Sequence, residues 1–191
     1  QDPSIKAVFT THSETSTGAV HDLEKIAAIT RARGKLLVVD GITAIGVHEV
    51  HQDRWGIDVI VCGSQKGMMI PPGIATVSLA PWAASAIEGV KLPRFYWDLL
   101  RARKSAPSGE TAFTPPVSLV LALEESLAMM REEGLENVWA RHTRLAHAMW
   151  AGAQALGFRL FSSSPAHSVT SLLPPEGVDA SGIVKRLREV H

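Results

Sequence analysis

The sequence predicts an α/β fold with a largely parallel sheet that is covered on both faces by helices. Largely apolar runs, such as KLLVV at 35–39 and IDVIVC at 57–62, alternate with segments whose apolar residues recur at helical spacing. Strands that are buried on both faces read as continuous apolar runs, which is typical of parallel sheets. With 191 residues, 46% of them hydrophobic, the chain can form one domain with a sizeable core or a large part of a bigger protein.

The first predicted elements are a strand at 5–10, a polar loop at 11–18 and a helix. The polar loop follows the strand directly, which is typical of a functional loop. We expect the helix to begin at Asp22, whose side chain can cap it, and to end at Gly34. Its apolar face is formed by residues at helical spacing, namely Leu23, Ile26, Ala27 and Thr30.

Three further strands are predicted at 35–39, 57–62 and 74–80. The first ends at Asp40 and the second ends close to Lys66. In α/β sheets, ligands gather at the carboxyl ends of the strands. The polar loop at 11–18, Asp40 and the segment 64–66 are therefore expected to share one edge of the sheet.

The second half of the sequence is mostly helical. A short helix is expected after Pro81, followed by a less regular region at 91–116 and by two long helices separated by Gly134. Strands at 158–161 and 169–173 and a helix at 183–190 follow. This change of pattern indicates the beginning of a second, smaller domain.

The composition points to a small-molecule partner. Nineteen Lys and Arg balance nineteen Asp and Glu, so no basic excess indicates nucleic acid or an anionic membrane. No apolar run approaches the ~20 residues that a membrane helix needs. The single cysteine, Cys62, cannot form an internal disulfide, which suits a reducing compartment. We therefore expect a soluble, cytoplasmic protein, and the absence of an initiator methionine or a signal sequence suggests a start in mid-protein.

Asp40 and Lys66 are the residues that most strongly indicate a catalytic site. Lys66 stands between an apolar strand and an apolar segment, where burying its ammonium would be costly. Pyridoxal phosphate needs a lysine for its Schiff base and an acid to keep its pyridine nitrogen protonated. Burial and a conjugated imine would remove the charge of the lysine. The phosphate would then be held by amides and hydroxyls, of which the sequence offers Thr15, Ser16, Gly18 and Ser64.

Simpler interpretations of both residues remain open. An aspartate at a strand end is commonly a cap or a metal ligand, and a lysine after Gly-Ser-Gln is commonly a solvated loop residue. His48 and His51 form an HxxH pair, but they lack a recognised ligand pattern and are interpreted as part of a solvated loop. No metal site is predicted.

Several motifs resemble those of a known family. They are THSETSTG at 11–18, VVDGITAIG at 38–46 and DRWGIDVIVCGSQKGMMIPPG at 53–73. The sequence resembles the class V aminotransferases of pyridoxal-phosphate fold type I, and within them the serine–pyruvate and alanine–glyoxylate aminotransferase group. The likeness extends to SGETAFTPPVSL at 108–119 and EEGLENVWARH at 132–142. It implies that 1–155 belong to the large cofactor-binding domain, without its N-terminal part, and that 156–191 begin a small α+β C-terminal domain.

The resemblance also implies roles for individual residues. Lys66 would form the Schiff base and shuttle the proton between the substrate and the cofactor, and Asp40 would pair with the pyridine nitrogen. Thr15 would form a hydrogen bond in the region of the cofactor's phenolic oxygen. Gln65 would help to hold the cofactor's phosphate, with Ser64 in the same turn. In the homodimer that the family forms, further contacts would reach the neighbouring subunit's phosphate from Thr114 and Thr111, the latter at a position where relatives often carry tyrosine.

The function implied by the resemblance is a transaminase that uses pyridoxal 5′-phosphate. It would move an amino group between serine or alanine and glyoxylate or pyruvate. One alternative is a fragment that keeps the sheet but serves only as a binding or assembly module. Another is a cysteine desulfurase or a different class V lyase, but those enzymes usually carry histidine before the lysine and a loop cysteine, where this chain has Gln65 and a strand cysteine, Cys62.

Two other expectations concern what the sequence lacks. A nucleotide-binding domain is disfavoured because no glycine-rich phosphate-loop motif follows any predicted strand. Relatives carry an N-terminal phosphate loop, an aromatic residue that stacks on the cofactor and a C-terminal carboxylate-binding arginine, none of which is recognised here. We therefore expect the catalytic middle of an enzyme.

Overall fold

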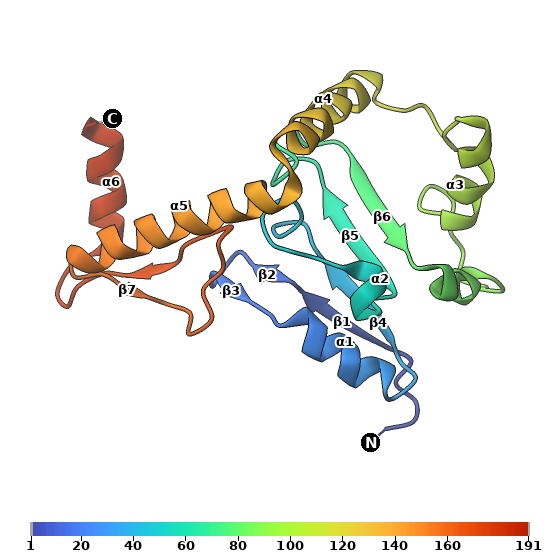
Figure 1. Cartoon of the computed structure of the whole chain (residues 1–191), viewed down its shortest axis with the longest axis horizontal. Coiled ribbons are helices and arrows are strands. Elements are labelled where there is room, and N and C mark those ends of the chain that lie inside the picture. The colour runs from blue at the N-terminus through green and yellow to red at the C-terminus, as the bar shows by residue number, and fades with distance from the viewer. Residues whose placement is uncertain (1, 191) are drawn as a thin grey trace.

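A four-stranded sheet is the centre of the computed structural model, which describes residues 2–190 (Figure 1). Its order is β1-β4-β5-β6, formed by Ala7–Thr11, Leu36–Asp40, Val59–Gly63 and Ala75–Leu79. The first three strands are parallel, whereas β6 runs antiparallel to β5. The predicted α/β class and mostly parallel, mixed sheet are therefore confirmed.

Helix α1, Leu23–Arg31, covers one face of this sheet. The Asp22 carboxylate accepts a hydrogen bond from the Lys25 N–H at 3.1 Å and caps the helix as predicted. The main buried cluster joins this helix to β4, β5 and Ile57, and comprises Leu23, Ala27, Leu37, Val39, Ile57 and Ile60. Helix α2, Gln52–Trp55, packs beside α1 and contributes Trp55 to the edge of the cluster.

The opposite face of the sheet is less completely covered than the apolar runs predict. Val38 and Val61 are half-buried, and Phe9 is 77% exposed. Because successive strand side chains point to opposite faces, Leu37 and Val39 reach the core while Val38 does not. Within residues 2–190, the cover expected on both faces is complete on the α1 face alone.

The polar loop after β1 forms a short hairpin. Its strands are β2, Ser13–Glu14, and β3, Ala19–Val20. Gly18 closes the turn with φ of 65°, and a Cβ at this position would lie 3.0 Å from the Ser171 backbone nitrogen. The glycine is therefore required both by its backbone conformation and by the chain that packs on it.

The second half of the chain contains the expected long helices. They are α4, Val117–Glu133, and α5, Leu135–Ala155, which meet at Gly134. The 3₁₀ helix η1, Pro81–Ile87, follows β6. The region predicted to be irregular holds helix α3, Leu99–Ser105, and a single 3₁₀ turn, η2, Ala106–Ser108.

The last segment returns to the β2–β3 hairpin. Strands β7, Arg159–Leu160, and β8, Leu172–Leu173, form a small antiparallel pair that precedes α6, Ala180–Val190. The loop that connects β7 to β8 bonds to the hairpin: its Ser164 carbonyl accepts from the Val20 N–H at 2.9 Å, and its Ala166 N–H donates to the Gly18 carbonyl at 2.8 Å. A domain boundary near 155 stays a prediction.

Within the described part of the chain, none of the helices has the length and apolar character to cross a membrane.

Candidate active site

Asp40 ends β4 at the carboxyl edge of the sheet. It lies in register between Thr11 of β1 and Val61 of β5, and its backbone carbonyl accepts a 2.8 Å hydrogen bond from the His12 N–H. Its carboxylate is exposed and accepts a 2.9 Å hydrogen bond from the Ile42 N–H. The strand and this bond together fix the position of an accessible negative charge.

Lys66 lies in the turn that follows β5. Ser64 stabilises this turn, because its buried hydroxyl donates to the Pro71 carbonyl at 2.8 Å and accepts from the Ile74 N–H at 3.2 Å. Lys66 itself is exposed. The expectation that Lys66 is buried is therefore wrong for the described chain, in which Ile70 of the same segment is buried and Lys66 is not.

The turn at 41–46, which follows Asp40, packs directly against the Lys66 turn. A Cβ on Gly67 would lie 2.1 Å from the Ile45 carbonyl oxygen, so only glycine allows the two backbones to approach this closely. From the other side, the Ser126 hydroxyl of α4 donates to the Met68 carbonyl. These contacts fix the ends of β4 and β5 relative to each other and bring Asp40 and Lys66 to the same edge.

The hydroxyl residues of the hairpin turn lie at this edge as well. The Thr15 hydroxyl is 2.9 Å from that of Thr43, in the turn after Asp40. The amide and hydroxyl of Ser16 both donate to one carboxylate oxygen of Glu14, and these bonds lower the pKa of Glu14. Gln65 is exposed next to Lys66.

Thr111 and Thr114 are the two candidate residues that follow η2. Both are exposed in the segment between η2 and α4, and the Thr111 hydroxyl donates to the Phe113 carbonyl. Within residues 2–190, no hydrogen bond connects either threonine to Asp40 or Lys66.

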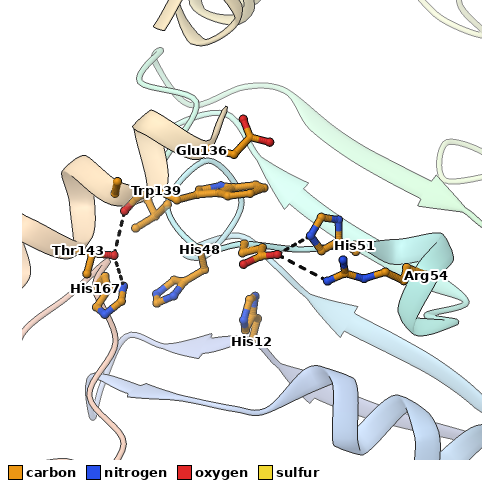
Figure 2. A pocket seen from close by; sticks show the side chains of 11 residues that line it. His12, His48, His51, Arg54, Glu136, Trp139, Thr143 and His167 are labelled. Atoms are coloured by element: carbon orange, nitrogen blue, oxygen red, sulfur yellow. Dashed lines mark hydrogen bonds and ion pairs between the residues drawn. The ribbon is translucent and has the colours of Figure 1, made fainter. Parts of the chain in front are cut away.

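A histidine-lined cavity of about 660 Å³ adjoins the end of β1, where His12 follows the strand (Figure 2). His12, His48 and His167 approach ring against ring, with centroids 5.3 Å apart for the first pair and 5.1 Å for the second. His48 is only 9% exposed, so its assignment to a solvated loop is wrong. The reason is that its partners come from 36 residues before it and 119 after it by residue number, which no local pattern reveals.

These imidazoles are held in their neutral form. Burial, reinforced by the neighbouring histidines His12, His167 and His142, lowers the pKa of His48 to about 3. Burial, with a smaller effect of His21, lowers the pKa of His12 to about 4. Within residues 2–190, no group of three or more His, Cys, Asp or Glu side chains is arranged to hold a metal ion.

Asp58 is a structural residue that the sequence analysis missed. It is buried, and its carboxylate accepts hydrogen bonds from the Leu37 N–H at 2.6 Å and from the Trp82 indole at 2.8 Å. It therefore links the start of β4 to η1. Its place within the predicted strand at 57–62 was visible in the sequence, but both of its partners are distant along the chain.

Cys62 lies buried within β5, and burial raises the pKa of its thiol. A reactive cysteine requires an accessible thiolate with a lowered pKa. Cys62 thus lies in a strand, as predicted, and its environment fits a structural thiol and not the loop nucleophile of a cysteine desulfurase.

Comparison with known proteins gives consistent family relationships. The family described as "Aminotransferase class-V" matches residues 2–190. The chain is 48% identical over 185 residues to the small subunit of a soluble hydrogenase from Synechococcus sp., covering 96% of this chain and 48% of the relative. It is 40% identical over 195 residues to an L-aspartate–glyoxylate aminotransferase from Paracoccus denitrificans, covering 98% of this chain and 48% of that protein.

Solved structures share the fold as well. The crystal structure of an alanine–glyoxylate aminotransferase from Nostoc sp. matches with a TM-score of 0.88 and 30% identity, over 96% of this chain and 50% of the other. The chain thus spans about half the length of the curated relatives that it matches. Pyridoxal 5′-phosphate is the cofactor that this relationship implies. With a matching family profile over 2–190 and matching architecture, the chain belongs to the class-V aminotransferase family.

Proposed function

We propose that the protein containing this chain is a transaminase that uses pyridoxal 5′-phosphate. The observation that carries the proposal is the placement of Asp40 and Lys66 at the ends of neighbouring strands, on one accessible edge of the sheet. Within residues 2–190, neither charge takes part in an ion pair. An acid and an amine that are both accessible and both outside any ion pair match what this cofactor requires of a protein.

Asp40 would hold the proton of the cofactor's pyridine nitrogen. When bound, the cofactor supplies an electron-withdrawing ring that stabilises negative charge at the substrate carbon. A carboxylate next to the ring nitrogen keeps that nitrogen protonated, because an adjacent negative charge favours the cationic form. The Ile42 N–H bond leaves the second carboxylate oxygen of Asp40 available for this contact.

Lys66 would anchor the cofactor covalently and then move a proton at the substrate's Cα. The turn that carries it is fixed by Ser64, Gly67 and Ser126, while the side chain itself remains exposed. A general base needs a fixed origin and a reach of about 3 Å to the proton that it transfers. The turn supplies the fixed origin, and the exposed amine is accessible to a ligand.

The remaining contacts to the cofactor would come from hydroxyl and amide groups. We assign Thr15 and Ser16, together with Gln65, to the cofactor's oxygen atoms, and we assign Ser64 to holding the turn. Thr111 and Thr114 would act across a homodimer interface, as the family resemblance implies. The predicted division at 155/156 into a large cofactor-binding domain and a small domain belongs to the same proposal.

The substrates that we propose are serine or alanine as donor and glyoxylate or pyruvate as acceptor. The names of several relatives support a small acceptor, since they pair glyoxylate with aspartate, serine or alanine. Two relatives are named as hydrogenase subunits, and we favour transamination because of the placement of Asp40 and Lys66. The lone cysteine supports a cytoplasmic location.

The test is to mix the chain with pyridoxal phosphate, reduce the mixture with borohydride and map the labelled peptide. We expect one label per chain, on Lys66, together with a visible absorbance band that Lys66→Ala abolishes. Lys91→Ala, at another exposed lysine, is the matched control and should leave both unchanged. Labelling scattered over surface lysines, or a band retained by Lys66→Ala, would contradict the assignment. Specific labelling without amino transfer would instead favour a binding or assembly module.

A further inference from the structure

The turn at 41–46 contacts each of the elements that form the candidate site. It begins next to Asp40, its Ile45 carbonyl packs against Gly67 beside Lys66, and its Thr43 hydroxyl bonds to that of Thr15. Two backbone hydrogen bonds stabilise it, because the Ala44 and Ile45 N–H groups both donate to the Gly41 carbonyl at 2.9 Å. Thr43 is therefore carried by a rigid segment.

Thr15, in contrast, lies in an exposed turn at the tip of the hairpin. The backbone of that turn is closed by a 2.9 Å hydrogen bond from the Gly18 N–H to the Glu14 carbonyl. Within residues 2–190, the Thr43 hydroxyl is the one hydrogen-bond partner of the Thr15 side chain. The rotamer of Thr15 therefore depends on Thr43.

The two hydroxyls can share their protons in two ways. Each carries one proton and two lone pairs, so either oxygen can be the donor. When Thr43 donates, the Thr15 proton remains free to be donated to another acceptor. An anionic oxygen near Thr15 selects this arrangement, since a charge-assisted hydrogen bond is stronger than a neutral one.

We propose that Thr43 is a positioning residue that holds the Thr15 hydroxyl with its proton directed toward an anionic oxygen of the cofactor. The inference rests on the proposed function for the identity of the acceptor. The positioning itself follows from the 2.9 Å contact and is independent of any cofactor.

The positioning is tested first in the chain without cofactor, by hydrogen–deuterium exchange. Thr43→Val removes the hydroxyl while it keeps the shape of the side chain, and Thr43→Ser keeps the hydroxyl. We expect Thr43→Val to speed exchange of the Ser16 and Gly18 amides about 3- to 10-fold, as for the loss of one net hydrogen bond, and Thr43→Ser to restore the original rate. Equal exchange in all three proteins would overturn the positioning role.

The second measurement is the binding of pyridoxal phosphate, followed by absorbance. We expect Thr43→Val to weaken binding about 3- to 10-fold and to raise the pH at which the bound chromophore loses its proton, because an anionic oxygen loses a donor. In a Thr15→Val background, Thr43→Val should have no further effect. An equal loss in that background would overturn the inference. A wild-type chain that binds no pyridoxal phosphate would overturn the proposed function and the assigned acceptor, while the exchange result would still decide the positioning role.

Discussion

The imidazole of His48 stacks on that of His167, with ring centroids 5.1 Å apart and planes inclined by only 12°. His48 follows the Asp40 turn, whereas His167 lies in the segment that returns from β7 to the hairpin. His12, at the end of β1, packs against His48 from the other side. Three segments that are distant in the sequence are thus joined through neutral imidazole rings.

This packing predicts that the chain loses stability in mild acid. The pKa of His48 in the folded chain is lowered to about 3 and that of His12 to about 4, whereas both titrate near 6.5 when unfolded. A lowered pKa means that the unfolded state takes up protons first, so stability is fully present above pH 6.5 and is lost as the pH falls toward 4 and 3. Each ring should cost on the order of 2 kcal/mol between pH 7 and pH 5. Urea unfolding at several pH values measures this loss.

The matched variants are His48→Gln and His21→Gln. The first removes one buried titrating ring and should flatten the pH dependence by about half. The second alters an exposed histidine whose effect on the pKa of His12 is the smaller one, so it should change the pH dependence only slightly. A pH dependence that is identical in wild type and His48→Gln would contradict this account. Both variants keep the other charged or titratable groups around the histidines, so these groups affect both pH profiles alike. They are Glu49, His51, Arg54, Glu136, His142 and His147.

Gly67 gives a second prediction, which concerns the Lys66 turn. In Gly67→Ala, the new methyl group would meet the Ile45 carbonyl oxygen at 2.1 Å, so one of the two turns has to move. Because the obstacle is backbone, we expect a destabilisation of about 2 kcal/mol or more, as for other overpacked positions. Labelling of Lys66 by pyridoxal phosphate should fall even at temperatures where the variant stays folded. Calorimetry and peptide mapping measure the two effects separately.

Gly152 provides the contrasting prediction, because it lies exposed within α5 with nothing within 4 Å of an added Cβ. Gly152→Ala should stabilise the chain by about 0.5–1 kcal/mol, since alanine loses less backbone entropy in a helix than glycine does. Urea unfolding tests this gain, and Lys66 labelling should be unaffected. If Gly67→Ala proved equally harmless, the close approach of the two turns would not hold in solution.

The fold could be predicted where local pattern and burial agree. The β4 and β5 strands were recognisable as continuous apolar runs, and α1 was recognisable from its Asp22 cap and helical spacing. The uneven covering of the sheet could not be predicted, because Val38 and Val61 are as apolar as Leu37 and Val39. Which of them finds a partner is decided by tertiary packing.

The candidate site was predictable to a similar extent. Asp40 and Lys66 could be placed at one edge because parallel strands end together, and β4 and β5 do pair in parallel up to Asp40 and Val61. Their roles stay predictions. Lys66 was predicted to be buried and is exposed, whereas His48 was predicted to be solvated and is buried. A turn can leave a charged side chain exposed, and a distant segment can bury a polar loop. Such long-range packing leaves no trace in local sequence.

Asp58 supports the last prediction, because it is a buried acid whose role is structural. In Asp58→Ala, the Leu37 N–H would lose its partner in the core and the Trp82 indole would lose its link to the sheet. We expect a loss of about 2–4 kcal/mol, because hydrogen bonds to a carboxylate are strong and a buried donor without a partner is costly. Asp53→Ala, at an exposed acid on α2, is the control and should stay within about 0.5 kcal/mol of wild type. Urea unfolding compares the two variants, and a similarly small effect at both sites would show that Asp58 does not hold β4 and η1 together.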